Sequence, residues 1–471
     1  MLDILITNGY VLTMEGPGVG MLPDGAVAIR DNKIVAVGPS RELEQNFQAR
    51  RRIDAKNKVV MPGLVDAHIH TGIGILRGLA QDTDNWMQQG LWPFTKTLTD
   101  EARVAGSLMN IIEGVKAGTT TFCDYDVPML QIAANHARVG TRARVAETIN
   151  EMPEDLSGLL VGDLYPLDPA IGNHKLTRAK SVFERWHGYD DNRITCLWGP
   201  QGPDMLSREL LQEVKALAEK HETMIHMHVA QGDREINQML KRYGMRSIQF
   251  LDELGYLDWR LLAVHLTEAT KEETQLVARR GAAMLLCSGS IGIIDGIVPP
   301  AAEFLEARGN LALGSDQAPG NNCNNMFNEM KFTAILNKCR FRDPRRFPAW
   351  QMLRLATIDG ARAIGLGEEV GSLRPGKKAD MIMIDLDNPA LAPIITDPVR
   401  NIVPNLVYSA NGSEVDTVII DGKIVMEARK ILTLDEKLAI AEAHRQAQLV
   451  ARKAKPDAAN VGMTMMRAGQ L

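Results

Sequence analysis

Two histidines separated by a single residue, His68 and His70, are the first residues in this chain whose types and spacing suggest chemistry. They end an apolar run that contains Leu64, Val65 and Ala67. Side chains at positions i and i+2 of a strand point to the same side. Because neutral imidazole is a common ligand of catalytic transition metals, the pair predicts part of a metal site at a strand end. Taken alone, two histidines that merely alternate in a strand remain an equal alternative.

Three further residues fit such a site, and each follows another short apolar run. His228 and His265 end two of these runs, and Asp316 ends a third. Each has an ordinary alternative: a core histidine, a hydrogen bond to a loop, or a helix N-cap. In a barrel of parallel strands, however, the carboxyl ends of all strands meet at one face. Ligand-type residues at four strand ends therefore favour one site, in which three histidines and an aspartate bind a metal and leave room for water.

The elements that must position these residues form an α/β pattern between residues 58 and 370. Short apolar runs alternate there with longer helical stretches, which is typical of a parallel sheet. Eight such runs can be counted, and eight is the number of strands in a closed (β/α)8 TIM barrel. The predicted strands are 59–70, 119–124, 143–148, 194–198, 224–229, 261–266, 283–288 and 311–316.

The two ends of the chain have a different pattern. Residues 1–57 and 371–430 contain alternating apolar runs with hairpin signals at Asp31-Asn32 and Asp421-Gly422. We therefore expect one small β-sandwich domain formed from both chain ends. Within residues 431–471, an amphipathic helix begins near Asp435. We expect this helix to pack on the body of the protein or on a partner subunit.

Composition narrows the class of protein. The 471 residues are 45% apolar and 24% charged, as in soluble globular proteins. A net charge of -5 without a basic block gives little support for nucleic-acid binding, and no apolar run reaches the ~18 residues of a membrane span. The five scattered cysteines and a first segment that reads as a strand favour a cytoplasmic protein with reduced thiols.

Six motifs are spread along the chain. They are Met61-Pro-Gly-Leu-Val-Asp-Ala-His-Ile-His, Leu76-Arg-Gly-Leu, Gly118-Thr-Thr-Thr-Phe, Leu313-Gly-Ser-Asp, Asp316-Gln-Ala-Pro-Gly-Asn-Asn with Met326, Glu329 and Met330, and Gly371-Ser-Leu-Arg-Pro-Gly-Lys-Lys-Ala-Asp. Together these motifs resemble the metal-dependent amidohydrolase superfamily. The closest likeness is to the branch of cytosine and guanine deaminases, adenosylhomocysteine deaminase and triazine hydrolases such as atrazine chlorohydrolase. Hydrolases of phenylurea and thiocarbamate herbicides such as molinate lie on the same branch.

This resemblance implies roles for the residues at the strand ends. His68, His70, His228 and Asp316 would bind one divalent transition metal, zinc first and otherwise iron, cobalt or manganese. Asp316 would also be catalytic, taking a proton from water and giving it to the leaving nitrogen. His265 would be catalytic as well, holding the water or stabilising an oxyanion. Binuclear relatives carry a carboxylated lysine, and runs 143–148 and 194–198 contain no lysine, which favours a mononuclear site.

Two departures from the branch concern the substrate. Ring deaminases carry a glutamate three residues after the strand-five histidine, where this chain has Gln231. A glutamine forms hydrogen bonds but cannot supply a titrating proton. A substrate-contacting histidine of the branch is here Gln201. We expect both glutamines to bind substrate, and we expect cleavage at an acyclic carbonyl, where no ring nitrogen needs a proton.

The segment after the first barrel strand predicts an apolar pocket. We expect Trp86, Trp92 and Phe94 to line it. The leading hypothesis is a mononuclear metal hydrolase, degrading xenobiotics, that cleaves amide, urea, carbamate or thiocarbamate bonds in small apolar compounds. The alternatives are a deaminase or dechlorinase of an N-heteroaromatic ring (triazine, purine or pyrimidine) and a non-catalytic scaffold. The expected partners are a small-molecule substrate and further copies of the chain in a homo-oligomer, without nucleic acid or membrane.

Overall fold

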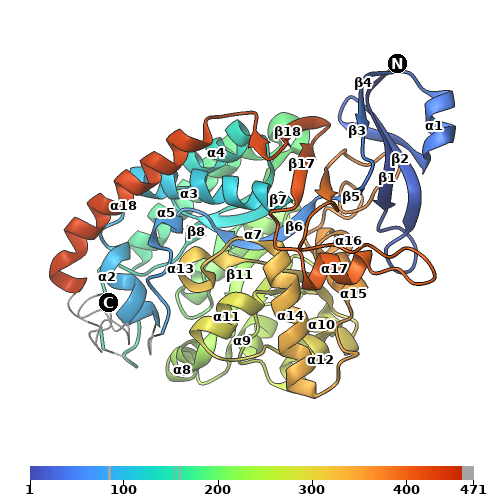
Figure 1. Cartoon of the computed structure of the whole chain (residues 1–471). Helices are drawn as coiled ribbons and strands as arrows, with labels where there is room; N and C mark the ends of the chain where they lie inside the picture. Colours follow the sequence, from blue (N-terminus) through green and yellow to red (C-terminus); the bar gives the residue numbers. More distant parts are fainter. Residues whose placement is uncertain (83–85, 154, 157–158, 161, 459–471) are drawn as a thin grey trace.

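The centre of the protein is a closed barrel of parallel strands surrounded by helices (Figure 1). The computed structural model describes residues 1–458 except 83–85, 154, 157–158 and 161. Neighbouring strands pair in chain order, a bridge between Trp198 and Ile225 joins the two halves, and the last strand pairs with the first. The (β/α)8 prediction is confirmed. The barrel strands are β6 (Leu64–His70), β7 (Thr119–Asp126), β8 (Arg142–Ile149), β9 (Ile194–Cys196) with β10 (Gly199–Pro200), β11 (Ile225–Val229), β12 (Leu261–His265), β13 (Ala283–Leu286), and β14 (Asn310–Leu313) with β15 (Asp316–Gln317).

The helices follow the strands as in a βα-repeat, and local capping signals fix several of their starts. Thr270 forms a capping box with Glu273 at the start of α10, the helix between the sixth and seventh barrel strands. No helix in the described ranges is long and apolar enough to cross a bilayer. The helices and turns of this layer are η1 (Gly74–Leu76), η2 (Met87–Leu91), α2 (Trp92–Thr95), α3 (Asp100–Lys116), α4 (Met129–Val139), α5 (Pro169–Trp186), α6 (Tyr189–Asn192), α7 (Arg208–Lys220), α8 (Gly232–Tyr243), α9 (Ser247–Glu253), α10 (Lys271–Arg280), α11 (Ser288–Ile294), α12 (Ala301–Glu306), α13 (Ala318–Asn321), α14 (Met326–Phe341), α15 (Ala349–Leu355) and α16 (Ile358–Ala363).

Strands from both chain ends pair in one nine-stranded sheet beside the barrel. Its strands are β1 (Leu2–Leu12), β2 (Met21–Arg30), β3 (Lys33–Pro39), β4 (Ala49–Asp54), β5 (Lys58–Pro62), β16 (Met381–Asp385), β17 (Val415–Ile420), β18 (Lys423–Glu427) and β19 (Lys430–Ile431), with α1 (Ser40–Asn46) and α17 (Ile402–Tyr408) between them. The hairpin turns lie at Asp31-Asn32 and Asp421-Gly422, as the sequence predicts. The remaining helix, α18 (Glu436–Ala458), lies along α3 and reaches α2 (Figure 1).

One predicted strand was wrong. The apolar run 59–70 is two strands, because β5 pairs with β1 and β16 of the terminal sheet, and only β6 belongs to the barrel. The boundary falls at Gly63, where an added Cβ would lie 2.1 Å from the side chain of Thr120. The barrel therefore begins after residue 62 rather than at residue 58.

A buried ion cluster joins the terminal sheet to the barrel. The Arg142 guanidinium on β8 donates to Asp380 at 2.6 Å and to Asp421 at 3.1 Å. All three side chains are nearly inaccessible. Asp380 ends the Gly371–Asp380 motif, so this motif serves the contact between the two domains.

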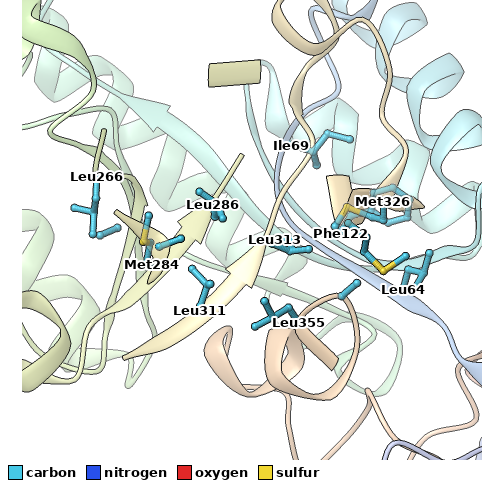
Figure 2. Close-up of a cluster of buried hydrophobic side chains, with 14 of the residues drawn as sticks. Leu64, Ile69, Phe122, Leu266, Met284, Leu286, Leu311, Leu313, Met326 and Leu355 are labelled. Carbon is cyan, nitrogen blue, oxygen red and sulfur yellow. The ribbon is translucent and has the colours of Figure 1, made fainter. Parts of the chain in front are cut away.

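Alternate residues of the barrel strands face the helices and the barrel interior. Leu311 and Leu313 on β14, with Met284 and Leu286 on β13, pack in the same cluster as Met326 of α14 (Figure 2). The alternating residues Leu285 and Ala312 belong to a separate cluster with Val65 and Ala67 of β6. At the end of β14, a Cβ on Gly314 would lie 2.8 Å from the His68 backbone nitrogen, so this glycine permits the close approach that brings Asp316 beside β6.

Candidate active site

The predicted ligands lie together at the carboxyl ends of the barrel strands. The Nε2 atoms of His68 and His70 are each 3.5 Å from Oδ1 of Asp316. Nε2 of His228 is 3.3 Å from Nε2 of His70. His265 completes the group, with its ring centre 5.7 Å from that of His68 and 5.4 Å from that of His228. The structure therefore brings together all five strand-end residues that the sequence singled out.

Hydrogen bonds fix which nitrogen of each ligand histidine faces the centre. Nδ1 of His70 donates to the Tyr125 carbonyl oxygen at 2.5 Å, and Nδ1 of His228 donates to the Gln201 carbonyl oxygen at 2.8 Å. With the proton held on Nδ1, Nε2 carries the lone pair that binds a metal. The two lone pairs face each other at 3.3 Å, which is unfavourable unless a cation lies between them.

His226 performs the same task for His68. Its Nε2 lies 2.8 Å from Nδ1 of His68. With the His68 proton on Nδ1 and shared with this nitrogen, Nε2 of His68 is left for the metal. The sequence did not single out His226 as a site residue. It is fully buried and orients a ligand.

The donor set fits a divalent transition metal. Nε2 of His68 makes no hydrogen bond with any described residue although it is buried. Burial lowers the pKa of His68 to about 4 and lowers that of His228 well below its usual value, so both imidazoles are neutral at pH 7 and are competent ligands. Buried, neutral, unpartnered nitrogens beside a carboxylate are what an N3O metal site requires.

Asp316 is held as a carboxylate by its surroundings. Burial opposes its ionisation, but the nearby His68, His265 and His70 outweigh burial and lower its pKa. Ser290 at the start of α11 donates to Oδ2 at 2.6 Å. Oδ1 is thereby left toward the histidines, and Oδ2 has a fixed position.

His265 reaches the centre through an unusual backbone conformation. On β12, Leu261 and Ala263 pack in one cluster and Leu262 and Val264 in the other. Strict alternation would turn His265 toward the helices, but its φ of 76° lies in the left-handed region and redirects the side chain. Such a conformation costs roughly 1–3 kcal/mol and is often found at functional sites. Neither ring nitrogen bonds to a described residue, although the side chain is fully buried.

A cavity of about 580 Å³ opens onto this group. Trp86, Trp92, Gln201 and Gln231 line it. Phe94 does not line it: this side chain is 8% exposed and packs in a cluster behind the cavity wall. The prediction for Phe94 was wrong because the sequence does not show which side of η2 and α2 faces the cavity. Further apolar lining residues are Ile73, Met87, Leu91, Leu98, Met152, Leu156 and Leu159.

The two glutamines are fixed by neighbouring groups. The backbone N–H groups of Ala230 and Gln231 donate to the Glu235 carboxylate at 2.7 and 2.9 Å. The Gln201 side-chain oxygen accepts a hydrogen bond from Asn150. Neutral amides therefore occupy the positions where the resemblance led us to expect an acid and a histidine.

Sequence reasoning missed two supporting residues besides His226. Ser290 lies 26 residues before Asp316, and nothing in the sequence connected the two residues. Tyr125, at the end of β7, packs its ring against His70, His226 and His228 and donates its hydroxyl to the Gly199 carbonyl oxygen. Its position at a strand end was the available signal.

A (β/α)8 barrel with this ligand set at its carboxyl face defines a metal-dependent hydrolase. Comparison with family models agrees with this class and names the family: residues 59–425 match the model of the amidohydrolase family. The chain belongs to the amidohydrolase family. Similar proteins are named as deaminases, which are hydrolases that act on C–N bonds.

Individual relatives cover almost the whole chain. It is 35% identical over 449 residues to a 5-methylthioadenosine/S-adenosylhomocysteine deaminase of Pelotomaculum thermopropionicum, covering 95% of this chain and 98% of the relative. The structure of an adenosine deaminase from Xanthomonas campestris with bound zinc superposes with a TM-score of 0.87 at 30% identity, covering 96% and 99% of the two chains. Atrazine chlorohydrolase from Arthrobacter aurescens shares the fold, with a TM-score of 0.84 at 20% identity over 94% of this chain and all of that one.

Proposed function

We propose that this protein hydrolyses a C–N bond at an acyclic carbonyl, of the amide, urea, carbamate or thiocarbamate type, in a small and largely apolar compound. One observation carries the proposal. Gln231 lines the cavity at the position where ring deaminases of this branch place the acid that protonates a ring nitrogen. An amide at that position suits a carbonyl substrate, because it can hold the substrate by hydrogen bonds without transferring a proton.

The proposed site holds one divalent transition metal, zinc first, on His68, His70, His228 and Asp316. Such an ion would lower the pKa of a water molecule to about 7 and polarise the substrate carbonyl. The remaining chemistry belongs to the protein. We also propose that the protein acts on a small-molecule substrate and forms a homo-oligomer. The proposed function involves neither nucleic acid nor a membrane.

Asp316 is the proposed proton carrier. Its ionised carboxylate accepts a proton as the water oxygen forms a bond to the carbonyl carbon. It then delivers that proton to the nitrogen as the C–N bond breaks, so the products are an acid (or carbamic acid) and an amine. Ser290, at 2.6 Å from Oδ2, keeps the carboxylate in one orientation during both transfers.

His265 is the proposed group that stabilises the developing oxyanion. Burial lowers its pKa to about 3, so it is neutral at pH 7 and one ring nitrogen carries a proton to donate. The absence of any described hydrogen-bond partner leaves that donor free for the reacting oxygen.

The cavity supports a substrate with one polar and one apolar part. Gln201, Gln231 and Asn150 line it together with His70, His228 and Asp316. Trp86 and Trp92 form part of its apolar lining. We infer that the carbonyl lies among the amides, while an aryl or alkyl substituent lies against the tryptophans.

Deamination of an aminopurine nucleoside is the second candidate. The relatives at 35% and 30% identity are named as deaminases of this kind and span nearly the whole chain, and their names favour this candidate over the first. The reaction needs a proton donor other than Gln231. Glu235 lines the same cavity, and burial raises its pKa to about 7, so it is the group that this route would use.

The two candidates are separated by the variant Gln231→Glu. Restoring an acid at this position should leave hydrolysis of a phenylurea or thiocarbamate unchanged or weaker and should strengthen ring deamination. Gln231→Ala serves as the control: if it removed activity on every substrate as completely as Asp316→Ala, Gln231 would be part of the proton transfer and the proposal for carbonyl substrates would fail.

A further inference from the structure

The C-terminal helix α18 buries a regular stripe of side chains between Ala439 and Ala454. The buried residues are Ala439, Ala443, Gln446, Val450 and Ala454, at spacings of three or four residues, so they lie on one face of the helix. The neighbouring face is open, and Leu449 there is 39% exposed. The stripe therefore docks the helix on the body of the protein.

The two halves of this stripe pack on different parts of the protein. Ala439 joins the main core, and the Lys116 ammonium donates to the Glu436 carboxylate at 2.9 Å. Val450 and Ala454, 3% and 0% exposed, belong to a separate cluster with Leu91 and Phe94. The first half is thus anchored independently of the second.

The second cluster is the back of the cavity wall. Leu91 belongs to the cluster and also lines the cavity, and Trp86 and Leu98 pack against the cluster while they line the cavity as well. The wall is built from η2 and α2, which are short elements. Segments this short have little stability of their own and depend on packing for a fixed position.

We propose that the distal half of α18 sets the position of the apolar cavity wall, and that Val450 and Ala454 are positioning residues for the apolar part of the substrate. Neither side chain lines the cavity. They act through Leu91 and Phe94, so they govern how tightly a bulky substituent is held and leave the proton-transfer groups on the barrel strands unaffected. The identity of the bulky substituent rests on the proposed function. The effect of α18 on the position of the cavity wall does not depend on it.

The test compares Val450→Asp and Ala454→Asp with Leu449→Asp. The first two place a carboxylate in an apolar cluster without a partner, which expels the distal helix; the third places it one residue away on the exposed face. Val450→Ala is a milder variant that keeps the helix and removes two methyl groups. The first readout is hydrogen exchange of the backbone amides in 86–98, measured on the zinc-loaded protein without substrate. The second is KM against kcat for a substrate with a bulky apolar group and for one without.

We expect faster exchange in 86–98 in the Val450 and Ala454 variants, with β11 to β14 and the metal content unchanged. KM for the bulky substrate should rise about tenfold, equivalent to roughly 1.4 kcal/mol, with kcat on the small substrate nearly unchanged. Leu449→Asp should match the parent protein. Unchanged exchange in Val450→Asp and Val450→Ala would overturn the inference. If exchange rises but no acyclic carbonyl compound is a substrate, the proposed function fails while the control of the wall stands.

Discussion

Replacing Ser290 by alanine tests the arrangement around Asp316 most sharply. The Ser290 hydroxyl donates to Oδ2 of Asp316 at 2.6 Å, and both side chains are buried. The variant removes this one hydrogen bond to the proposed proton carrier. Ser288→Ala is a matched control on the same helix, because the Ser288 hydroxyl is also buried but bonds to Thr333 Oγ1 at 2.8 Å.

The size of the effect follows from the charge on the acceptor. A hydrogen bond to a charged group contributes about 1.5–3 kcal/mol. If the bond is needed for Asp316 to hold its orientation in the transition state, its loss lowers kcat by about one to two orders of magnitude. Loss of a neutral hydrogen bond at Ser288 costs about 0.5–1.5 kcal/mol of stability, and it should leave kcat within about twofold because no reacting group is touched.

The assay measures kcat, KM and the urea midpoint of the zinc-loaded parent and both variants. We expect kcat to fall in Ser290→Ala only, whereas the urea midpoint should fall in both. Equal kcat in Ser290→Ala and the parent would refute the positioning role of this hydroxyl. Equal losses of kcat in the two variants would show that the effect is structural.

Three further predictions follow from the same geometry. Removing the metal with a chelator should lower the melting temperature, since a ligand at about 1,000 times its dissociation constant contributes about 4 kcal/mol; a melting temperature that does not respond to chelator or to added zinc would contradict the metal site. Burial raises the pKa of Glu329 from 4.5 to about 8, so its neutral form stabilises the fold below pH 4.5 and this contribution is lost as pH rises through 8. Urea unfolding at pH 5 and 8 should show this loss in the parent and a smaller one in Glu329→Gln, and equal losses would contradict it. Finally, Phe94→Ala should lower stability by about 3–5 kcal/mol, whereas Trp92→Ala should mainly raise KM; the reverse assignment would mean that the wall faces the other way.

The sequence predicted the site better than its surroundings. His68, His70, His228, His265 and Asp316 could be found because each ends an apolar run, and a parallel barrel gathers strand ends at one face. The position of a residue at a strand end does not reveal which residues of other strands or helices form hydrogen bonds with it. The contacts of His226 with His68 and of Ser290 with Asp316 join residues 158 and 26 positions apart.

The errors also have physical causes. The run 59–70 is mostly apolar and almost wholly buried, because β5 is buried in the terminal sheet and β6 in the barrel, and periodicity alone does not divide it. Phe94 was assigned to the pocket because it lies in the same apolar segment as Trp86 and Trp92. Its side chain instead belongs to the cluster that contains Val450 and Ala454 of α18, a helix more than 300 residues later in the chain, and no local pattern reveals that contact.

The measurement that tests the central claim most directly combines metal content with product analysis on the purified protein. It should compare amine release from a phenylurea and a thiocarbamate with ammonia release from adenosine and an aminotriazine. The account predicts a bound divalent metal and turnover of the acyclic carbonyl compounds, with ring deamination weaker or absent until Gln231→Glu is introduced. Bound metal with turnover of adenosine alone would contradict it and would assign the protein to the deaminases that its relatives are named for.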